Sequence, residues 1–213
     1  MKKLILSVVL VMLVAGAYGQ NYRSPQNDWY RNELFLNPMR FFDGTFALGY
    51  QRNFYNSAIS LMPSITLMGE SIFRSEDSFY SEMEGFGIEG IYKVYFARMP
   101  RKVQVYLGPY LSYDYIKEKN RLPDYVDPQD IPNIEASDLY TRYNILKAGV
   151  LFGVHFMWGR FTLDMNVGGG VRYPTVTGFR ERYPSIVSVP TGFSELGHKG
   201  VVPKGNIALG VAF

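Results

Sequence analysis

Few side chains in this sequence suit acid–base or nucleophilic chemistry, because the chain contains two histidines and no cysteine. His198 lies in the stretch SELGHKG, close to Ser194 and Glu195, and a Ser/His/Glu set can supply a nucleophile, a base and an orienting acid. The members of such a triad are defined by their geometry in space, and residues this close in one loop seldom form it. We therefore predict no catalytic residue and keep this set as the alternative.

Charged residues recur on the polar side of segments in which polar and apolar residues alternate. Unpaired charges in a narrow interior would be costly, so we expect a paired polar core, with a proton or ion path as the alternative. His155 lies near the end of one such segment, next to Trp158, where we expect a structural hydrogen bond. The charged residues are Glu89, Lys93, Asp114, Lys147, Asp164 and Arg172.

A further candidate for chemistry is the acidic segment 117–141, KEKNRLPDYVDPQDIPNIEASDLYT. Closely spaced carboxylates can bind calcium, but this segment lacks the ordered spacing and the glycine of an EF-hand loop. We therefore predict a solvated acidic surface, with no metal site and no cofactor. The carboxylates are Asp124, Asp127, Asp130, Glu135 and Asp138.

The segments that carry these residues alternate as strands with two different faces do. In TFALGYQRNF, for example, Phe46, Leu48 and Tyr50 share one face. The alternating runs are longer than the usual strand of about 5–6 residues, and a tilted strand that crosses a bilayer needs about 9–11. The pattern predicts strands over 45–54, 57–68, 85–96, 103–116, 147–156, 161–172 and 204–213.

The connections between these strands alternate between short and long. Outer-membrane barrels have short turns at one end and long loops at the other, so the length of a connection indicates the strand direction. A further strand over 32–39, turning at 40–44, is needed to bring the chain to the start of strand 45–54. We therefore predict an all-β, eight-stranded antiparallel transmembrane β-barrel. Short turns are expected at 55–57, 97–102 and 157–160, and long loops at 70–83, 117–141 and 173–203.

Alternation alone does not say which face lies inside, and in a lipocalin-like soluble barrel the apolar face would line a ligand pocket. Three features favour the membrane version: a glycine-rich polar face, aromatic residues at both rims, and a closing strand, ending at Phe213, that leaves no open edge. The aromatic residues are Phe54, Tyr55, Phe96, Phe156, Trp158 and Phe161 beside the short turns, and Tyr113, Tyr115, Tyr143 and Tyr173 opposite. The glycines are Gly49, Gly87, Gly108, Gly149, Gly153, Gly168 and Gly170.

The first residues are typical of a secretory signal, because Lys2 and Lys3 precede a short apolar run and small residues up to Gly19. We predict a signal peptide over residues 1–19 and a barrel domain over residues 20–213, exported to the outer membrane, with a retained anchor as the alternative. The formal net charge is +3, of which the two leader lysines supply two, so no nucleic-acid partner is expected. Without cysteine, no disulfide and no lipoprotein anchor is expected.

Two prolines, Pro63 and Pro109, lie within predicted strands, where each removes a hydrogen bond of the ladder. In a barrel without a free edge, such a gap needs a bulge or a locally opened wall. We expect a simple bulge at each proline, and an opening that admits lipids from the side is the alternative.

Three stretches resemble the small outer-membrane barrels of the Bacteroidetes: GIYKVYF, VYLGPYLSY and GVLFGVHFMWGRFTLDMNVGGGVRY. The resemblance covers about residues 32–173 together with 204–213. Gln20 after the cleavage site is similar to exported proteins of that phylum, and the terminal Phe213 is similar to the signal that the outer-membrane insertion machinery reads. The resemblance implies a fold and a location, and this family has no shared catalytic residues to carry over.

These observations predict a structural or partner-binding role, as an accessory subunit or in adhesion, for a barrel with a filled lumen and no open pore. External loops on a rigid barrel are where binding usually resides, so loops 117–141 and 173–203 are the expected contacts with another outer-membrane protein complex. Outer-membrane lipids and lipopolysaccharide are the other expected partners. The alternative is a lipid-modifying enzyme, since the Ser/His/Glu set resembles that of small-barrel lipid A deacylases and the strand prolines resemble those of palmitoyl-transfer barrels.

Overall fold

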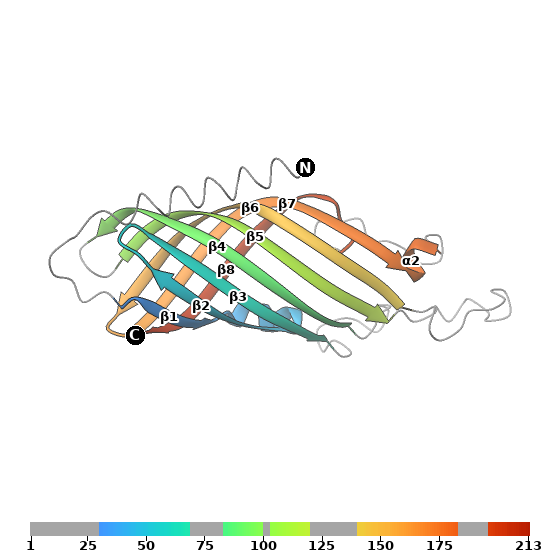
Figure 1. The fold of residues 1–213 in the computed structure, drawn as a ribbon, viewed down its shortest axis with the longest axis horizontal. Helices are drawn as coiled ribbons and strands as arrows, with labels where there is room; N and C mark the ends of the chain where they lie inside the picture. Colours follow the sequence, from blue (N-terminus) through green and yellow to red (C-terminus); the bar gives the residue numbers. More distant parts are fainter. Residues whose placement is uncertain (1–29, 69–82, 100–102, 120–139, 183–195) are drawn as a thin grey trace.

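The chain folds into a closed barrel of antiparallel strands, as seen in a computed structural model that describes residues 30–68, 83–99, 103–119, 140–182 and 196–213. Each strand pairs with the next and β1 also pairs with β8, which gives eight strands in a closed sheet (Figure 1). The predicted all-β class and the eight-stranded antiparallel barrel are confirmed. The elements are β1 (Asn32–Leu36), the 3-10 helix η1 (Pro38–Asp43), β2 (Thr45–Asn53), β3 (Ser57–Met68), β4 (Met83–Met99), β5 (Val103–Lys119), β6 (Tyr140–Trp158), β7 (Phe161–Gly178), α2 (Phe179–Arg182) and β8 (Gly200–Ala212).

The long strands extend further than the sequence pattern predicts, because β4, β5, β6 and β7 contain 17, 17, 19 and 18 residues. Strand pairing continues to Lys119 on β5 and to Gly178 on β7, both in segments predicted as loops. Backbone hydrogen bonds need no apolar side chains, so the ladder persists where the alternation of polar and apolar residues has ended. Segments 69–82, 120–139 and 183–195, the remainder of the predicted long loops, lie outside the described residues.

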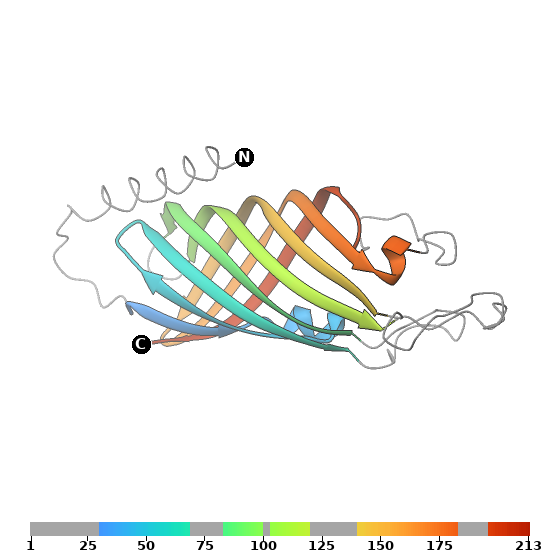
Figure 2. The same ribbon diagram turned by 45° about the vertical axis from the view of Figure 1, so that its right-hand side comes forward.

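The first strand is shorter than predicted, because β1 ends at Leu36 and the helix η1 follows where a strand to residue 39 was expected. Pro38 has no backbone N–H for a strand ladder and suits the first turn of a helix. Gly44 ends η1 with a φ of 64°, a left-handed conformation that favours glycine. Since β8 pairs with β1 only over Leu209–Ala212, η1 occupies the seam beside the rest of β8 (Figure 2).

The apolar face of every strand points outward. Leu61, Val150 and Phe152 have 47–48% of their surface exposed, whereas polar residues of the opposite face, such as Ser60, are buried. A soluble barrel that holds its ligand against an inward apolar face is therefore ruled out for this chain. No helix among the described residues is long and apolar enough to cross a membrane.

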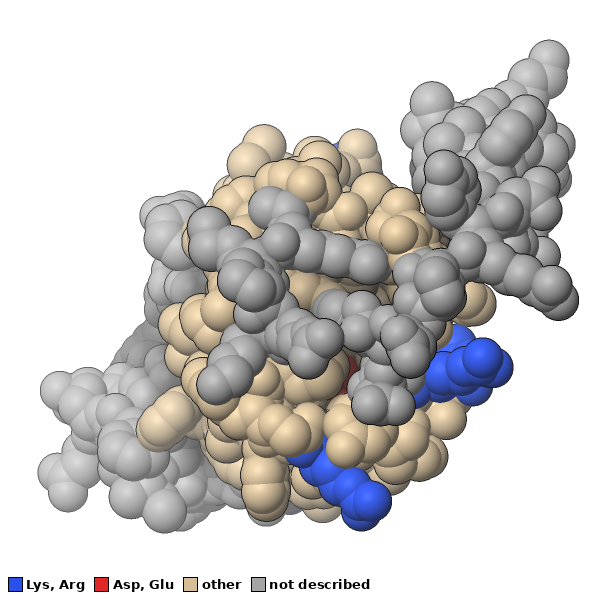
Figure 3. Space-filling model, turned by 90° about the vertical axis from the view of Figure 1, so that its left-hand side faces the viewer, with Lys and Arg blue, Asp and Glu red and all other residues tan. Residues whose placement is uncertain are grey.

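The outward apolar surface forms a belt with polar borders, as a bilayer requires. On the side of the long connections, Lys117 forms an ion pair with Glu84 at 3.0 Å, and the Tyr113 hydroxyl donates to Asn144 at 2.7 Å. At the end that carries the short turns, neutral side chains cover most of the described surface, with Lys and Arg projecting from the rim (Figure 3). The exposed aromatic residues beside those turns are Phe54, Tyr55, Phe96, Trp158 and Phe161.

The prediction for one rim residue is wrong. Tyr143 is fully buried inside the barrel, where its hydroxyl donates to Glu118 at 2.6 Å. The residues of β6 that face inward have odd numbers, as Leu151 and His155 show, and Tyr143 shares this parity. An aromatic residue near a rim can therefore belong to the interior when its position along the strand requires it.

Glycines on the inner face lie directly opposite large aromatic residues on the neighbouring strand. Tyr106 pairs with Gly153 and Tyr110 with Gly149 between β5 and β6, and a Cβ on Gly153 would meet the Tyr106 ring. A narrow barrel has room for such a ring only where the opposite residue has no side chain. The glycine-rich polar face thus permits an aromatic filling.

The predicted bulges at the strand prolines are absent. Pairing between β2 and β3 is interrupted opposite Pro63 and pairing between β4 and β5 opposite Pro109, but the register is the same on both sides of each gap. The register shift that the described strands do contain lies between Tyr95 and Ala97. The backbone N–H that each proline lacks therefore interrupts the strand pairing locally, and no extra residue is inserted into the strand.

Candidate functional site

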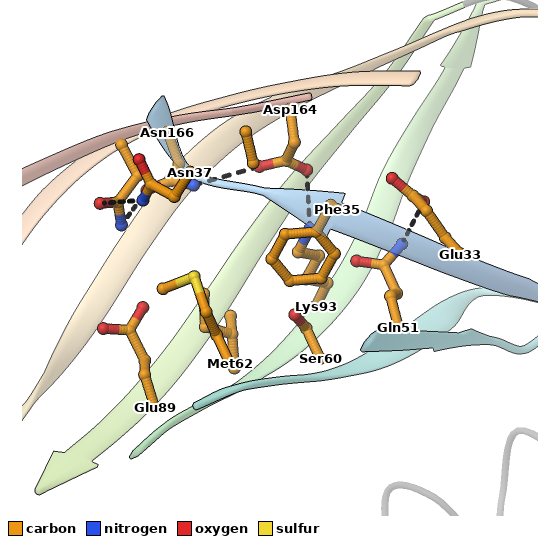
Figure 4. A pocket seen from close by; sticks show the side chains of 13 residues that line it. Glu33, Phe35, Asn37, Gln51, Ser60, Met62, Glu89, Lys93, Asp164 and Asn166 are labelled. Atoms are coloured by element: carbon orange, nitrogen blue, oxygen red, sulfur yellow. Dashed lines mark hydrogen bonds and ion pairs between the residues drawn. The ribbon is translucent and has the colours of Figure 1, made fainter. Parts of the chain in front are cut away.

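The interior of the barrel contains two groups of charged side chains. We call the first the turn-side cluster, since it lies nearer the short turns; its residues are Glu33, Lys93, Tyr106, His155 and Asp164. The Lys93 ammonium donates to Asp164 Oδ2 at 2.7 Å (Figure 4). The Tyr106 hydroxyl donates to Asp164 Oδ1 at 2.7 Å. His155 Nδ1 lies 3.2 Å from Asp164 Oδ2. Asp164 is thus saturated by partners from β4, β5 and β6.

Glu33 completes the turn-side cluster from β1. Its carboxylate accepts hydrogen bonds from the Thr162 hydroxyl and, at 3.2 Å, from the Gln51 amide. His155 Nε2 lies 3.7 Å from Glu33, beyond hydrogen-bond distance, and has no hydrogen-bond partner in the described structure. An Asp–His pair is present, and no hydroxyl of the described residues bonds to the free nitrogen, as a catalytic triad requires.

The second group, the loop-side cluster, lies towards the long connections and comprises Arg40, Glu89, Asp114, Lys147, Arg172 and Lys204. Glu89 Oε2 accepts from Arg40 at 2.8 Å and from the Lys204 ammonium, which also lies 3.9 Å from the centre of the Tyr110 ring. Lys147 forms an ion pair with Asp114 at 2.7 Å. Residues of η1 and β8 thereby meet residues of β4, β5 and β6 inside the barrel.

A small cavity lies beside these groups. Its lining includes Phe35 and Met62, together with charged residues of both clusters such as Glu89 and Asp164 (Figure 4). The free volume is about 20 Å³, which is room for about one water molecule. This cavity therefore has no space for a lipid chain.

The prediction of a paired polar core is confirmed where the ion pairs are seen: Lys93 pairs with Asp164, Lys147 with Asp114, and Glu89 with cations from η1 and β8. Arg172 also faces the interior, directly opposite Lys147. The structural hydrogen bond expected for His155 is present, with Asp164 as its partner.

Sequence reasoning missed Glu33, Arg40, Tyr106 and Lys204 as members of these clusters. Arg40 lies in a helix where a turn was predicted, so no strand parity could place it. Lys204 could have been found, because it shares its parity with the inward Asn206 on the predicted closing strand.

The other candidate sites of the sequence fall largely beyond what the structure describes. His198 is described and half-buried, but Ser194 and Glu195 lie outside the described residues, as do the acidic residues considered for calcium. Within the described part of the chain, no group of three or more His, Asp or Glu residues is placed to hold a metal ion.

No protein-family model matches the chain, and no curated protein matches it. A crystal structure of Neisserial surface protein A (NspA) is similar over 84% of this chain and 92% of that chain, with 14% sequence identity and a TM-score of 0.42. This level of similarity says nothing about what the chain binds.

Proposed function

We propose that this protein is an integral outer-membrane β-barrel with a filled lumen and a structural or partner-binding role. The observation that carries the proposal is the inversion of its surfaces: apolar side chains are exposed all around the barrel, while charged pairs such as Lys93–Asp164 are buried inside. Only hydrocarbon makes such an exterior favourable, and closure of the sheet satisfies the backbone groups that hydrocarbon cannot.

The rim at the long connections is the surface that we assign to partners. Strands β4 to β7 continue past the polar border of the belt, so they extend a rigid wall beyond the bilayer. The described ends of segments 117–141 and 173–203 lie in that wall, and a rigid scaffold beneath a connection favours binding. Another outer-membrane protein complex is the partner class that we favour, in an accessory or adhesive role.

The membrane assignment also requires export. The leader over residues 1–19 is the proposed signal peptide, with the barrel domain starting at Gln20. In the outer membrane, the apolar belt would contact lipid chains and the polar residues at its border would meet lipopolysaccharide headgroups.

The test is gentle detergent extraction of native outer membranes containing the tagged full chain, followed by mass spectrometry of co-purifying proteins. A stoichiometric outer-membrane partner that is lost when residues 120–139 are replaced by a Gly/Ser linker would support the accessory role. Replacement of residues 183–195 in the same way tests the second proposed contact segment, and Lys117→Met is the control that alters the rim outside both replaced segments. Recovery of the protein in the soluble fraction would overturn the membrane assignment, and recovery without a partner, together with altered lipid A in cells lacking the gene, would favour a lipid-modifying enzyme.

A further inference from the structure

The two ends of the barrel differ in the charge of their sequences. The long connections 70–83 and 117–141 contain more Asp and Glu than Lys and Arg, and 173–203 is nearly balanced. The short connections 97–102 and 157–160 contain basic residues and no acidic residue. These basic residues are Arg98, Arg101, Lys102 and Arg160, of which Arg101 and Lys102 lie outside the described residues. The end of the barrel that carries the short turns is therefore the basic end.

Three arginines at this end belong to the described residues. Arg31 and Arg160 are exposed, Arg52 is partly exposed, and Lys and Arg side chains project from the rim in Figure 3. None of the three forms an ion pair with a carboxylate of the described residues. The described acidic side chain nearest to them in the sequence, Glu33, is 2% exposed and lies inside the barrel. A terminal carboxylate on Phe213 would offset one of these positive charges, so the rim would still be basic.

The strand ladder fixes the positions of these arginines. The Arg31 carbonyl accepts a hydrogen bond from the last residue of β2 at 2.8 Å, and the Arg160 carbonyl accepts one from the last residue of β8 at 2.7 Å. Arg52 Nη1 donates to the Asn32 side-chain oxygen at 2.6 Å, which uses one of the five N–H donors of a guanidinium. Since β7, β8, β1 and β2 are neighbours in the barrel, the three arginines lie along one continuous part of the rim.

Exposed aromatic side chains indicate the depth of this rim in a bilayer. Trp158 and Phe161, which are 50% and 70% exposed, are register partners on either side of the turn that contains Arg160. Phe54, which is 42% exposed, follows Arg52 by two residues. Aromatic belts lie at the level of the lipid headgroups, and a strand advances about 3.3 Å per residue. Arg52 and Arg160 therefore lie at the level of the lipid phosphates.

From this arrangement we propose that the turn-end rim, formed by Arg31, Arg52 and Arg160, binds the headgroups of anionic phospholipids in the leaflet that contacts the short turns. A guanidinium forms charge-assisted hydrogen bonds with phosphate oxygens, and basic residues beside a bilayer attract anionic lipids. A soluble protein fits this surface less well, because the described short turn at Gly159 and Arg160 joins its strands through two residues. The proposal rests on the membrane assignment made above, and it adds the class of lipid and the rim that selects it.

The test uses Trp158 as a reporter, because it is exposed beside Arg160 and is one of two tryptophans in the chain. Trp29→Phe removes the other. The full chain is reconstituted into vesicles of phosphatidylglycerol and phosphatidylcholine in which one or the other lipid is brominated, and quenching of Trp158 gives the relative affinity of the rim for the two lipids. We expect a preference of about fivefold for phosphatidylglycerol at low salt, which decreases at high salt. Both leaflets have the same composition, so the direction of insertion does not affect the result.

Arg160→Gln should lower this preference by about twofold or more, because it removes the cation beside the reporter. Arg160→Lys keeps the positive charge and should retain most of the preference. Lys117→Met is the matched control, because it removes a cation that forms an ion pair with Glu84 at the opposite end of the barrel, and it should leave the preference unchanged.

Equal quenching of Trp158 by the two brominated lipids would overturn this proposal and leave the membrane assignment intact. Absence of quenching by either lipid would overturn the membrane assignment as well. An equal loss of preference in Lys117→Met and Arg160→Gln would mean that the total charge of the protein, and not the turn-end rim, selects the lipid, which would also overturn the proposal.

Discussion

At the residue scale, the interior is organised around carboxylates that each collect several donors. Asp164 accepts from Lys93 and Tyr106 and contacts His155, so its charge is shared by residues of three other strands. Removal of one partner from a buried ion pair is far more costly than replacement of both, because the remaining charge is left uncompensated.

We therefore expect Lys93→Met to lower the free energy of unfolding by about 3–5 kcal/mol, and the double variant Lys93→Met/Asp164→Leu to lower it by less. Urea unfolding of the barrel in micelles, followed by tryptophan fluorescence, measures both. Lys117→Met serves as the exposed control and should change stability little, because its ion pair with Glu84 is solvated. A double variant that is less stable than the single one would show that this network is cooperative beyond its charge balance.

A second residue-scale prediction concerns the glycine opposite Tyr106. Gly153→Ala places a methyl group against the Tyr106 ring and should cost about 1–3 kcal/mol by overpacking. Gly90→Ala is the control, since the nearest atom to its Cβ would be 3.6 Å away. Thermal unfolding followed by circular dichroism compares the two variants. Equal stability of Gly153→Ala and the wild type would mean that the Tyr106 ring can move aside.

At the element scale, the sequence predicted strand faces better than strand ends. Alternation separates Leu61 from Ser60 and Tyr92 from Lys93 without any tertiary information, because the period of a strand is two residues, whereas the choice of the inner face needed further arguments. Strand ends are set by backbone pairing, which continues through Lys119 and Gly178 after the side-chain pattern has changed. The sequence did not predict the helix η1 for a related reason, since this helix depends on contacts with β2 and β8, which are tertiary contacts.

The strand prolines give the prediction at this scale. Pro109→Ala restores a backbone donor where the ladder between β4 and β5 is interrupted, which favours the folded state. The loss of the proline ring also gives the unfolded chain more conformational freedom, which opposes this gain in stability. We expect the stability to stay unchanged or to rise by about 1 kcal/mol at most. Pro63→Ala, at the corresponding gap between β2 and β3, should behave alike. Hydrogen exchange of the neighbouring amides reports whether the ladder closes, and a large loss of stability would assign the proline ring a packing role.

At the scale of the whole molecule, the sequence determined what fills the lumen but not how the charges are partnered. Glycines such as Gly153 and the aromatic Tyr106 could each be assigned to the inner face by parity. Which cation meets which carboxylate depends on the stagger of the strands, and Glu89 reaches Arg40 and Lys204 from two elements distant in sequence.

The proposed filled lumen leads to the last prediction, which concerns conductance. The cavity beside Phe35 and Met62 has about 20 Å³ free, whereas a hydrated ion needs a continuous aqueous path. We therefore expect purified protein in planar bilayers to show no conductance above background, with a known porin reconstituted in parallel as the positive control. Stable channel steps from the wild type would contradict the filled lumen. If steps appeared only in Lys93→Met/Asp164→Leu, the buried ion pair would be identified as the element that closes the path.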